Sequence, residues 1–228
     1  MNAPARLPGR IGPNALLITA AAVPLTGWAL HAVSLYKQIA DSRKDLLTEL
    51  PCRPDFVAYG EQLLRTRRRD AVHVLMLDGV DFKAVNDTYG HTAGDTVIQT
   101  LGRRLARWSS GRRALAARLG GDEFAVCAVI PPSAALAEIT ALREQLRQPI
   151  QYEGHTLRLD VSIGIARAAD LPGEGMSRIL RGADTAMYRV KKGEETFPYV
   201  ATRDDAYTET VNGRRAGRRG THLLAGAA

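Results

Sequence analysis

Cysteine is scarce in this sequence, and Cys52 and Cys127 are the only two among 228 residues. Two cysteines do not build the disulfide framework of a small secreted domain, so we expect a reducing, cytosolic setting. Cys127 lies in an apolar pattern typical of a strand, which predicts a buried small hydrophobic residue.

Aromatic residues are also few, at 6% of the chain, although its formal net charge is +7. A basic balance is typical of proteins that bind nucleic acid, anionic lipid or phosphorylated ligands. Proteins that hold single strands interleave aromatic with basic residues, and no such pattern occurs here, so we expect no nucleic acid partner. Residues 201–228 are Gly- and Arg-rich and weakly apolar, which predicts a disordered basic tail.

The most distinctive feature that the chain does have is a Gly-Gly pair between two β-prone runs, within residues 117–126. Gly120-Gly121 predicts a tight hairpin. Because glycine leaves no side chain above the turn, a bulky ligand could lie against this backbone. Asp122 and Glu123 open the returning strand beside that bare patch. An ordinary hairpin with a solvated acidic tip is an equally good interpretation of these residues alone.

A second stretch favours the functional interpretation. An apolar strand over residues 72–77 leads directly into Asp78. The residues that follow at fixed spacing are Asp81, Phe82, Lys83, Asn86, Asp87, Gly90, His91, Gly94 and Asp95. Together with Gly120-Gly-Asp-Glu-Phe124, this stretch resembles the GGDEF family of diguanylate cyclases over about residues 45–200. Several separated motifs occur in the family's order, so the resemblance is specific.

Helical and strand patterns interleave with hairpins, which favours an α+β fold over a doubly wound α/β fold. We expect helices over 53–69, 93–108, 134–147 and 176–190, and strands over 72–77, 114–119, 123–130, 150–152, 157–166 and 197–200. The resemblance implies a ferredoxin-like palm, as in nucleotidyl cyclases and polymerases, with a central, mostly antiparallel sheet flanked by helices. The expected organisation is a tail (1–14), a transmembrane helix (15–36), a connector helix (37–50), the GGDEF domain (51–200) and the basic tail (201–228).

The carboxylates indicate the chemistry. If the strands that carry Asp78 and Asp122 are neighbours, both side chains point at one spot. Oxygen ligands and a triphosphate suit Mg²⁺, and the resemblance implies the carbonyl of Gly79 as a third protein ligand. The metal would neutralise phosphate charge and activate a ribose hydroxyl. Either Asp122 or Glu123 could accept the proton of the 3′-hydroxyl, and the sequence does not separate these roles.

The remaining substrate contacts come from the resemblance. It implies that Lys83 and Lys191 hold phosphates, that Phe82 and Lys83 offer backbone N–H groups, and that Gly120 and Gly121 lie against the substrate. Asn86 and Asp95 match the residues that read guanine, and His91 resembles a nearby substrate contact. A carboxylate that accepts from guanine N1 and N2 would reject adenine, which lacks those donors. Local structure is the alternative for each residue: a turn at Asn86 and Asp87, a helix N-cap at Asp95 and a loop at His91.

Three positions depart from the family pattern. Val80 stands where a second Asp is usual, with Asp81 one residue later. Gly193-Glu-Glu195 replaces the usual Gly-Arg-Asn after the last helix. Gly111 and Ala114 occupy the places of an inhibitory Arg-x-x-Asp pair.

The leading prediction is a diguanylate cyclase that joins two GTP into cyclic di-GMP and releases pyrophosphate. Each domain would bind one GTP, so the active unit would be a homodimer. The alternative is a catalytically silent domain that acts as a GTP-binding or protein-interaction module. The intact Gly-Gly-Asp-Glu-Phe and Asp78 favour the enzyme, whereas Val80 and Glu194-Glu195 favour the silent module.

Residues 15–36 contain no Lys, Arg, Asp or Glu, and a helix of that length crosses a bilayer, which takes ~20 apolar residues. A signal peptide and a buried core helix are the alternatives. Export would separate the domain from cytosolic GTP, so we favour a signal anchor. Lys37, Arg43 and Lys44 follow the span and favour a cytoplasmic domain at the inner (plasma) membrane.

Overall fold

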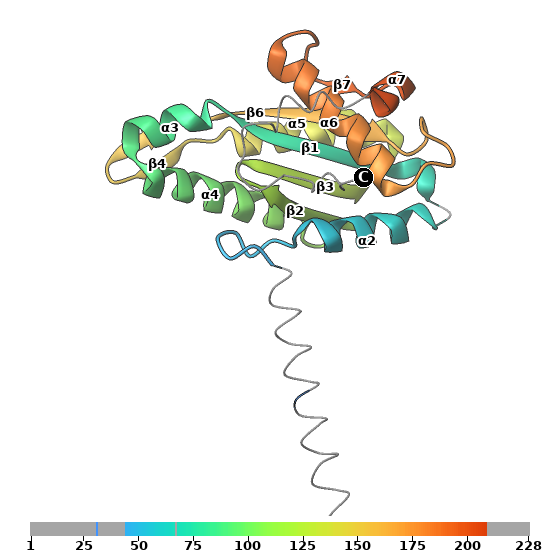
Figure 1. Ribbon diagram of the computed structural model, residues 1–228, viewed down its shortest axis with the longest axis horizontal. Helices are drawn as coiled ribbons and strands as arrows, with labels where there is room; N and C mark the ends of the chain where they lie inside the picture. The colour runs from blue at the N-terminus through green and yellow to red at the C-terminus, as the bar shows by residue number, and fades with distance from the viewer. Residues whose placement is uncertain (1–30, 32–43, 67, 209–228) are drawn as a thin grey trace, which may run out of the picture. The chain divides into compact units, whose positions relative to one another are not determined.

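The structure is a computed structural model that describes residue 31, residues 44–66 and residues 68–208 (Figure 1). The chain divides into two units, residues 1–43 and 44–228, and the fold described below belongs to the second. The predicted tail, the transmembrane helix apart from His31, and residues 37–43 of the connector lie outside the described residues. Among the residues that are described, no helix is long and apolar enough to cross a bilayer.

A five-stranded sheet with strand order β2-β3-β1-β6-β7 forms the centre of the domain (Figure 1). The central strand β1 (Val72–Val80) pairs antiparallel with β3 (Glu123–Val129) on one side and β6 (Asp160–Arg167) on the other. The edge strand β2 (Ala114–Gly120) is antiparallel to β3, and the other edge strand β7 (Tyr199–Val200) is parallel to β6. The mostly antiparallel α+β sheet is therefore confirmed, with β1 at the centre.

Both faces of the sheet are covered by helices, which explains why β1 reads as a continuous apolar run. Successive strand residues point to opposite faces. Leu75 and Leu77 belong to the core cluster that also holds residues of α4 (His91–Ser109) and α5 (Pro132–Leu146). Val74 and Met76 belong to the cluster with α2 (Arg53–Leu64) and α6 (Met176–Lys192). Cys127 is fully buried in this second cluster, as predicted.

One helix was not expected from the sequence. The helix α3 (Phe82–Tyr89) begins two residues after β1, with Asp81 in the left-handed conformation at φ 59°. None of its residues is fully buried, and its eight residues are fewer than the roughly 11–18 over which a helical period is recognised. The interpretation of Asn86 as a turn residue is thus wrong, because Asn86 lies inside this helix.

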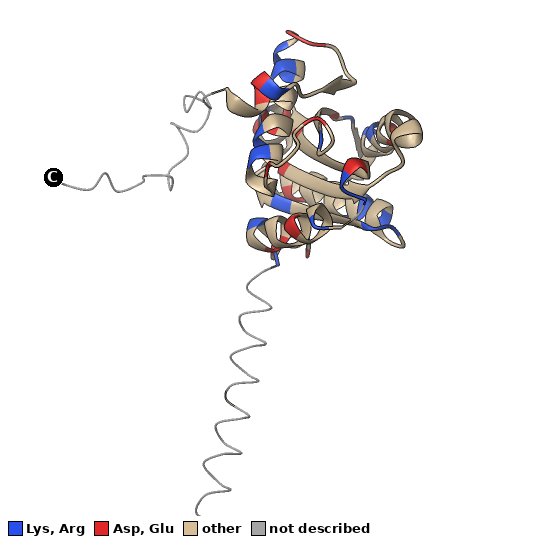
Figure 2. Ribbon diagram, turned by 90° about the vertical axis from the view of Figure 1, so that its right-hand side faces the viewer, with Lys and Arg blue, Asp and Glu red and all other residues tan. Residues whose placement is uncertain are grey.

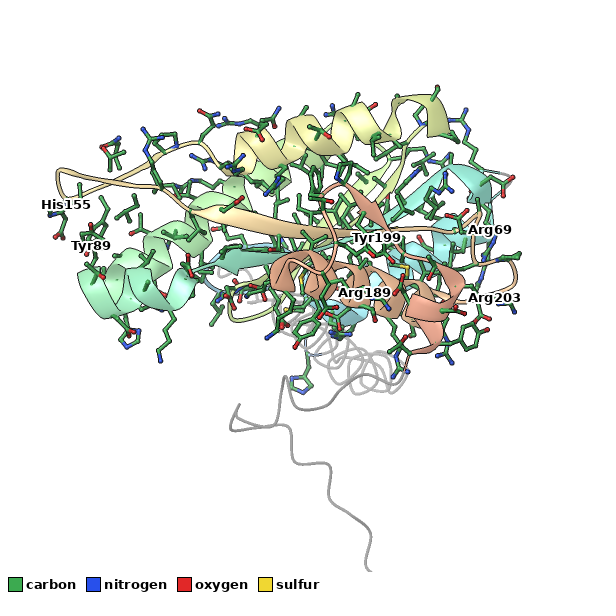
Figure 3. All side chains as sticks on the ribbon, turned by 90° about the horizontal axis from the view of Figure 1, so that it is seen from above. Arg69, Tyr89, His155, Arg189, Tyr199 and Arg203 are labelled. Carbon is green, nitrogen blue, oxygen red and sulfur yellow. The ribbon has the colours of Figure 1, made fainter. Side chains whose placement is uncertain are left out.

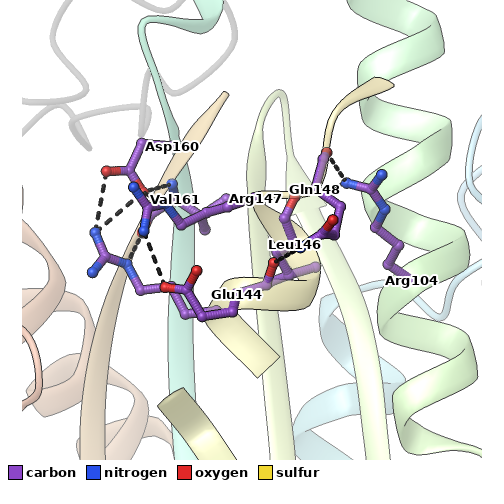
Figure 4. A network of polar contacts seen from close by, with 8 residues as sticks. Arg104, Glu144, Leu146, Arg147, Gln148, Asp160 and Val161 are labelled. Atoms are coloured by element: carbon purple, nitrogen blue, oxygen red, sulfur yellow. Dashed lines mark hydrogen bonds and ion pairs between the residues drawn. The ribbon is translucent and has the colours of Figure 1, made fainter. Parts of the chain in front are cut away.

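The strand predicted over 157–166 is divided in two. β5 (His155–Leu157) pairs with β4 (Ile150–Tyr152) in a separate two-stranded hairpin, and β6 begins only at Asp160. The Asp160 carboxylate accepts from Arg143 at 3.1 Å, pairs with Arg147 at 3.0 Å and accepts the Val161 N–H at 2.7 Å (Figure 4). These contacts fix the start of β6 against the end of α5.

Arg104 secures the segment between α5 and β4 (Figure 4). Its guanidinium donates to the carbonyls of Leu146 and Gln148 at 2.8 Å and of Pro149 at 3.0 Å. Because a single α4 side chain satisfies three carbonyl groups of the connection, α4 and α5 are held in one arrangement under the sheet.

Two boundary predictions before β1 are corrected. α2 ends at Leu64 rather than residue 69, and a 3₁₀ turn (Arg69–Ala71) follows. Residues 44–50 form a turn rather than the end of a connector helix. The turn is closed by a bridge between Lys44 and Pro51 and by Asp45, which accepts from the Thr48 N–H at 2.8 Å.

The predicted disordered tail is also corrected at its start. Residues 203–207 form the helix α7 (Arg203–Tyr207), which packs on α6. Asp205 is fully buried and accepts from the Tyr199 hydroxyl and from the Thr202 N–H, each at 2.8 Å, and it forms an ion pair with Arg189 at 3.1 Å. A capping box with Thr202 therefore orders this segment, while residues 209–228 lie outside the description.

Candidate active site

Strand register brings the predicted carboxylates to one end of the sheet. Asp78 lies directly opposite Glu123 in the β1–β3 ladder. The hairpin turn before Glu123 uses positive φ at Gly120 (148°) and Gly121 (54°). The Asp122 Cβ lies 3.8 Å from the point where a Gly79 side chain would begin. The condition that the two strands be neighbours is therefore met.

Asp78, Gly79 and Asp122 line one narrow hollow together with apolar core residues. Its volume of about 10 Å³ cannot hold a nucleotide. A nucleotide bound at this end of the sheet would therefore lie outside the hollow.

Asp78 is the buried carboxylate of the site, at 8% exposure. The ammonium of Lys191, in the last turn of α6, donates to Asp78 Oδ1 at 2.5 Å. Burial raises the pKa of Asp78 above its usual range, and the charges of Asp122 and Glu123 add to this, while Lys191 opposes it. The ionised form of Asp78 thus depends on a cation beside it.

The donor set is compatible with a magnesium ion. No cluster of three or more His, Cys, Asp or Glu side chains placed for a metal occurs in the described part of the chain. Mg²⁺ typically takes only one or two carboxylates, and phosphate oxygens and water complete its shell. Asp78 and Asp122, with the carbonyl of Gly79, would fit this pattern once Lys191 had left Asp78.

The start of α3 faces the same end of the sheet. Its first residues, Phe82 and Lys83, have N–H groups without an intrahelical acceptor, and the helix dipole favours an anion there. The Phe82 Cβ lies 3.5 Å from the Gly79 side-chain position, which places this helix start against β1. Lys83 is exposed. These are the features that phosphate binding would need.

The predicted guanine-reading residues share the junction of α3 and α4. The Asn86 Oδ1 lies only 1.9 Å from the point where a Gly94 side chain would begin, so residue 94 must be glycine for Asn86 to pack there. Asp95 is the next residue and is exposed, as is His91. The N-cap of α4 is Gly90, so the alternative of Asp95 as a helix N-cap is wrong.

An aromatic contact lies at the end of α3. The rings of Tyr89 and His155, from the β4–β5 hairpin, lie together at one end of the domain (Figure 3), with their centroids 5.3 Å apart. Charged residues of both signs are interspersed along the ribbon in the view of Figure 2.

Sequence reasoning missed the residue that connects the Gly-Gly turn to the start of the domain. Arg118 donates from Nη1 to both oxygens of Asp45 at 2.9 Å and from Nε to the Gly121 carbonyl at 2.9 Å. Burial alone would raise the pKa of Asp45, but hydrogen bonds from Arg118 and Thr48 outweigh it, so the pKa is lowered. An arginine two residues before Gly-Gly was the available signal.

Comparison with known proteins identifies the family. Residues 42–196 match the family model described as diguanylate cyclase, GGDEF domain. The chain belongs to the GGDEF family. A 19.3 kDa protein encoded in the repSA 5′ region of Streptomyces ambofaciens is 41% identical over 169 residues, which cover 74% of this chain and 89% of that protein.

Other GGDEF relatives carry named activities. The bifunctional diguanylate cyclase/cyclic di-GMP phosphodiesterase MucR of Pseudomonas aeruginosa is 42% identical over 156 residues, which cover 64% of this chain. The diguanylate cyclase TpbB of that species is 37% identical over 158 residues, which cover 65% of this chain. This chain spans only 22% of the length of MucR and 35% of that of TpbB.

Solved GGDEF structures share the fold. The GGDEF domain of TpbB from P. aeruginosa has a TM-score of 0.65 at 32% identity and covers 72% of this chain and 97% of its own. The GGDEF domain of DgcB from Caulobacter crescentus, solved in complex with c-di-GMP, has a TM-score of 0.61 at 26% identity over 72% of this chain and 97% of its own. The palm-like α+β fold is thus the fold of the family.

Proposed function

We propose that this chain is a diguanylate cyclase that condenses two GTP molecules into cyclic di-GMP and releases two pyrophosphates. The observation that carries the proposal is the register of β1 and β3, which places Asp78 opposite Glu123 and beside Asp122. Two carboxylates at one strand end, next to an open helix N-terminus, form a site for a metal-bound triphosphate.

The roles of the chain's own residues follow from their positions. The start of α3 and Lys83 would hold the triphosphate, and Lys191 would leave Asp78 to neutralise phosphate charge. A magnesium ion, when bound, would neutralise the phosphates and lower the pKa of the attacking hydroxyl. Asp78, Asp122 and the Gly79 carbonyl would hold this ion.

The reaction itself is a displacement that occurs twice. The 3′-oxygen of one GTP bonds to the α-phosphorus of the other, and the bond from that phosphorus to the pyrophosphate oxygen breaks. The proton of the 3′-hydroxyl goes to a carboxylate, which is either Asp122 or Glu123. Because each domain would hold one GTP, both displacements need two domains face to face, and the proposed active unit is a homodimer.

Selection of guanine would rest on Asn86 and Asp95 at the α3–α4 junction, with His91 close by in the first turn of α4. The contact of Asn86 with Gly94 supports this role, because it holds the amide beside the residue that precedes Asp95.

We also propose that residues 15–36 anchor the chain in the inner membrane, with the catalytic domain in the cytoplasm, on the basis of their uncharged length.

A silent GTP-binding module is the second candidate. Val80 and Glu194-Glu195 favour it because they depart from the family pattern. The ion pair between Lys191 and Asp78 also favours it, since a protein that binds no metal could retain that pair permanently.

Incubation of the full chain with GTP and Mg²⁺, followed by chromatography and mass analysis, separates the two candidates. We expect cyclic di-GMP and pyrophosphate from the unchanged chain and no product when Asp122→Asn and Glu123→Gln are combined. The exposed hairpin residue Glu153 provides the matched control, and Glu153→Gln should retain full activity. Binding of GTP without any product would contradict the enzyme and support the silent module.

A further inference from the structure

Four polar or charged residues are classed as buried in the described part of the domain: His73, Asp78, Ser162 and Asp205. Asp205 holds the C-terminal segment, His73 contacts the Ala71 carbonyl through Nδ1, and Asp78 belongs to the proposed active site. Ser162 is 4% exposed, and its hydroxyl makes no hydrogen bond to any described residue. The hydroxyl oxygen itself keeps some contact with solvent, so the hydroxyl is available to donate to a neighbouring group.

Strand register places Ser162 beside the proposed metal ligand. Asp78 and Ser162 are direct partners in the antiparallel β1–β6 ladder. Direct partners point to the same face of a sheet, with their Cβ atoms about 4.5–5.5 Å apart. The hydroxyl of Ser162 is therefore within reach of the Asp78 carboxylate, directly or through one water.

The packing of α6 explains why this point is enclosed. A Gly164 side chain would begin 2.1 Å from the Ala183 carbonyl oxygen and from the Met187 nitrogen, so α6 lies directly on β6. Lys191 follows Met187 by four residues, about one helical turn, and its ammonium reaches Asp78. Ser162 precedes Gly164 by two residues on the same face of β6. Lys191, Asp78 and Ser162 thus converge at one place.

Asp78 would need a new donor during the proposed reaction. In this structure the Asp78 carboxylate accepts from the Lys191 ammonium. If that ammonium moved to the triphosphate, one oxygen of the Asp78 carboxylate would be available to hold a metal ion. The other oxygen would then be buried without a donor, near the negative charges of Asp122 and Glu123.

We propose that Ser162 is a positioning residue whose hydroxyl donates to the Asp78 carboxylate when Lys191 moves to the substrate, and so holds that carboxylate in the orientation that binds the metal. The proposal rests on the proposed function for the role of Asp78. Partners of this kind, which orient a ligand from outside, typically change metal affinity or activity by 10–100-fold when they are removed.

The test compares Ser162→Ala with Ser162→Thr, which retains a hydroxyl, and with Ser109→Ala as a matched control. The Ser109 hydroxyl is buried and has no hydrogen-bond partner among the described residues, and it lies at the far end of α4 from the His91 side. The first measurement is the Mg²⁺ dependence of binding a GTP analogue with an uncleavable methylene bridge between its α- and β-phosphates. This readout needs no turnover.

We expect the Mg²⁺ concentration for half-maximal analogue binding to rise about tenfold or more in Ser162→Ala. It should be unchanged in Ser109→Ala and restored in large part in Ser162→Thr. Without nucleotide, Ser162→Ala should be as stable as the unchanged chain or more stable, because the hydroxyl has no partner in that state. Equal Mg²⁺ dependence of Ser162→Ala and the unchanged chain would overturn the proposal.

Asp78→Asn provides the second arm. If Ser162 acts through Asp78, then Ser162→Ala should add nothing to the loss of Mg²⁺-dependent binding that Asp78→Asn already causes. Full additivity of the two losses would contradict the role. An unchanged chain that binds the analogue with Mg²⁺ but makes no cyclic di-GMP would refute the proposed function and leave the Ser162 result standing. A chain that shows no Mg²⁺-dependent binding would refute both.

Discussion

Asp78 is a residue whose proposed function, metal binding by an ionised carboxylate, lowers the stability of the fold. Its pKa is raised in the folded state by burial, so the folded state binds the proton more tightly than the unfolded state does. The stability that this proton contributes is fully present below the ordinary carboxyl pKa, 3.8. It is lost as the pH rises through the raised value in the folded protein. At neutral pH the ionised carboxylate is therefore a cost of the site, and Lys191 offsets part of it.

Asp78→Asn should separate these two effects. Without nucleotide at pH 7, we expect its urea midpoint to equal or exceed that of the unchanged chain, because the buried negative charge is gone. Its cyclase activity should fall by at least about 100-fold, since a proposed metal ligand is lost. Urea unfolding at pH 5 and pH 8 also tests the direction of the pKa shift of Asp78. The variant should exceed the unchanged chain in stability by more at pH 8 than at pH 5. A variant that is clearly less stable at pH 8 would show that the ion pair outweighs the burial cost.

Asp95 gives the second prediction at the scale of residues. Because Asp95 is exposed on α4, Asp95→Ala should change the free energy of unfolding by no more than about 0.5 kcal/mol. Affinity for GTP should fall by more than tenfold, and the preference over ATP should largely disappear, because the acceptor for guanine N1 and N2 is removed. Calorimetric titration with GTP and ATP measures both effects. A loss of stability in proportion to the loss of binding would refute a role in base recognition.

At the scale of elements, the sequence predicted what has a strong pattern. β1, β3 and α4 were found because their apolar residues recur with clear strand or helix periods. α3 was missed because its eight residues are too short a window for a helical period to be recognised. The break before β6 was missed because it depends on Asp160, which forms ion pairs with Arg143 and Arg147 on α5 and just after it. These arginines lie 17 and 13 residues earlier in the chain. Such contacts are tertiary and leave no local signal.

In the candidate site, too, the residues with a recognisable motif were predicted and the tertiary contacts between them were not. The sequence predicted that Asp78 and Asp122 would point at one spot if their strands were neighbours, and the register of β1 and β3 meets that condition. The contact of Lys191 with Asp78 was not predicted, because the family match assigned Lys191 to phosphate. The place of Ser162 depends on strand register, which a single sequence specifies only weakly when both faces of a strand are buried.

Arg118 connects the turn at residues 44–50 to the Gly-Gly hairpin, which are far apart in sequence. Its side chain is 15% exposed and that of Asp45 is 23% exposed, so the pair is mostly shielded from water. Arg118→Met should lower the free energy of unfolding by about 1–3 kcal/mol, because the Asp45 carboxylate loses a charged partner. Urea denaturation measures this loss. The control is Arg103→Met, whose exposed contact with Thr100 should be worth less than about 0.5 kcal/mol.

A double-variant cycle tests whether the two residues act as a unit. If they do, Asp45→Ala combined with Arg118→Met should cost clearly less than the sum of the two single changes. Additive losses would mean that Arg118 contributes chiefly through the Gly121 carbonyl.

α7 was predicted to be disordered, yet it contains the fully buried Asp205. Asp205→Ala removes the acceptor of Tyr199 and Thr202 and the ion-pair partner of Arg189, and we expect a loss of about 3–5 kcal/mol in the free energy of unfolding. Asp204 is exposed in the same helix, so Asp204→Ala should have little effect. Urea denaturation of the two variants decides the matter. Similar small effects of both would restore the interpretation of residues 201–208 as a loose tail.

At the scale of the whole molecule, the proposed reaction needs two domains, while the described domain carries the residues of one half-site. An association between two free domains costs translational and rotational freedom. A shared membrane surface lowers this cost by raising the effective concentration of each domain near the other. The uncharged stretch of residues 15–36 and the proposed dimer are therefore two parts of one hypothesis.

Deletion of residues 1–36 tests that hypothesis. Each truncated chain should retain its affinity for the methylene-bridged GTP analogue, because the proposed binding residues all lie between Asp78 and Lys191. Turnover per mole should fall at low protein concentration and recover as the concentration rises, since pairing then depends on free diffusion. Steady-state assays over a thousandfold range of protein concentration, with the full-length chain in lipid vesicles as the control, measure this dependence. Full turnover that does not change with concentration would show that residues 1–36 do not control pairing, and recovery of the full-length chain in the soluble fraction would refute the anchor itself.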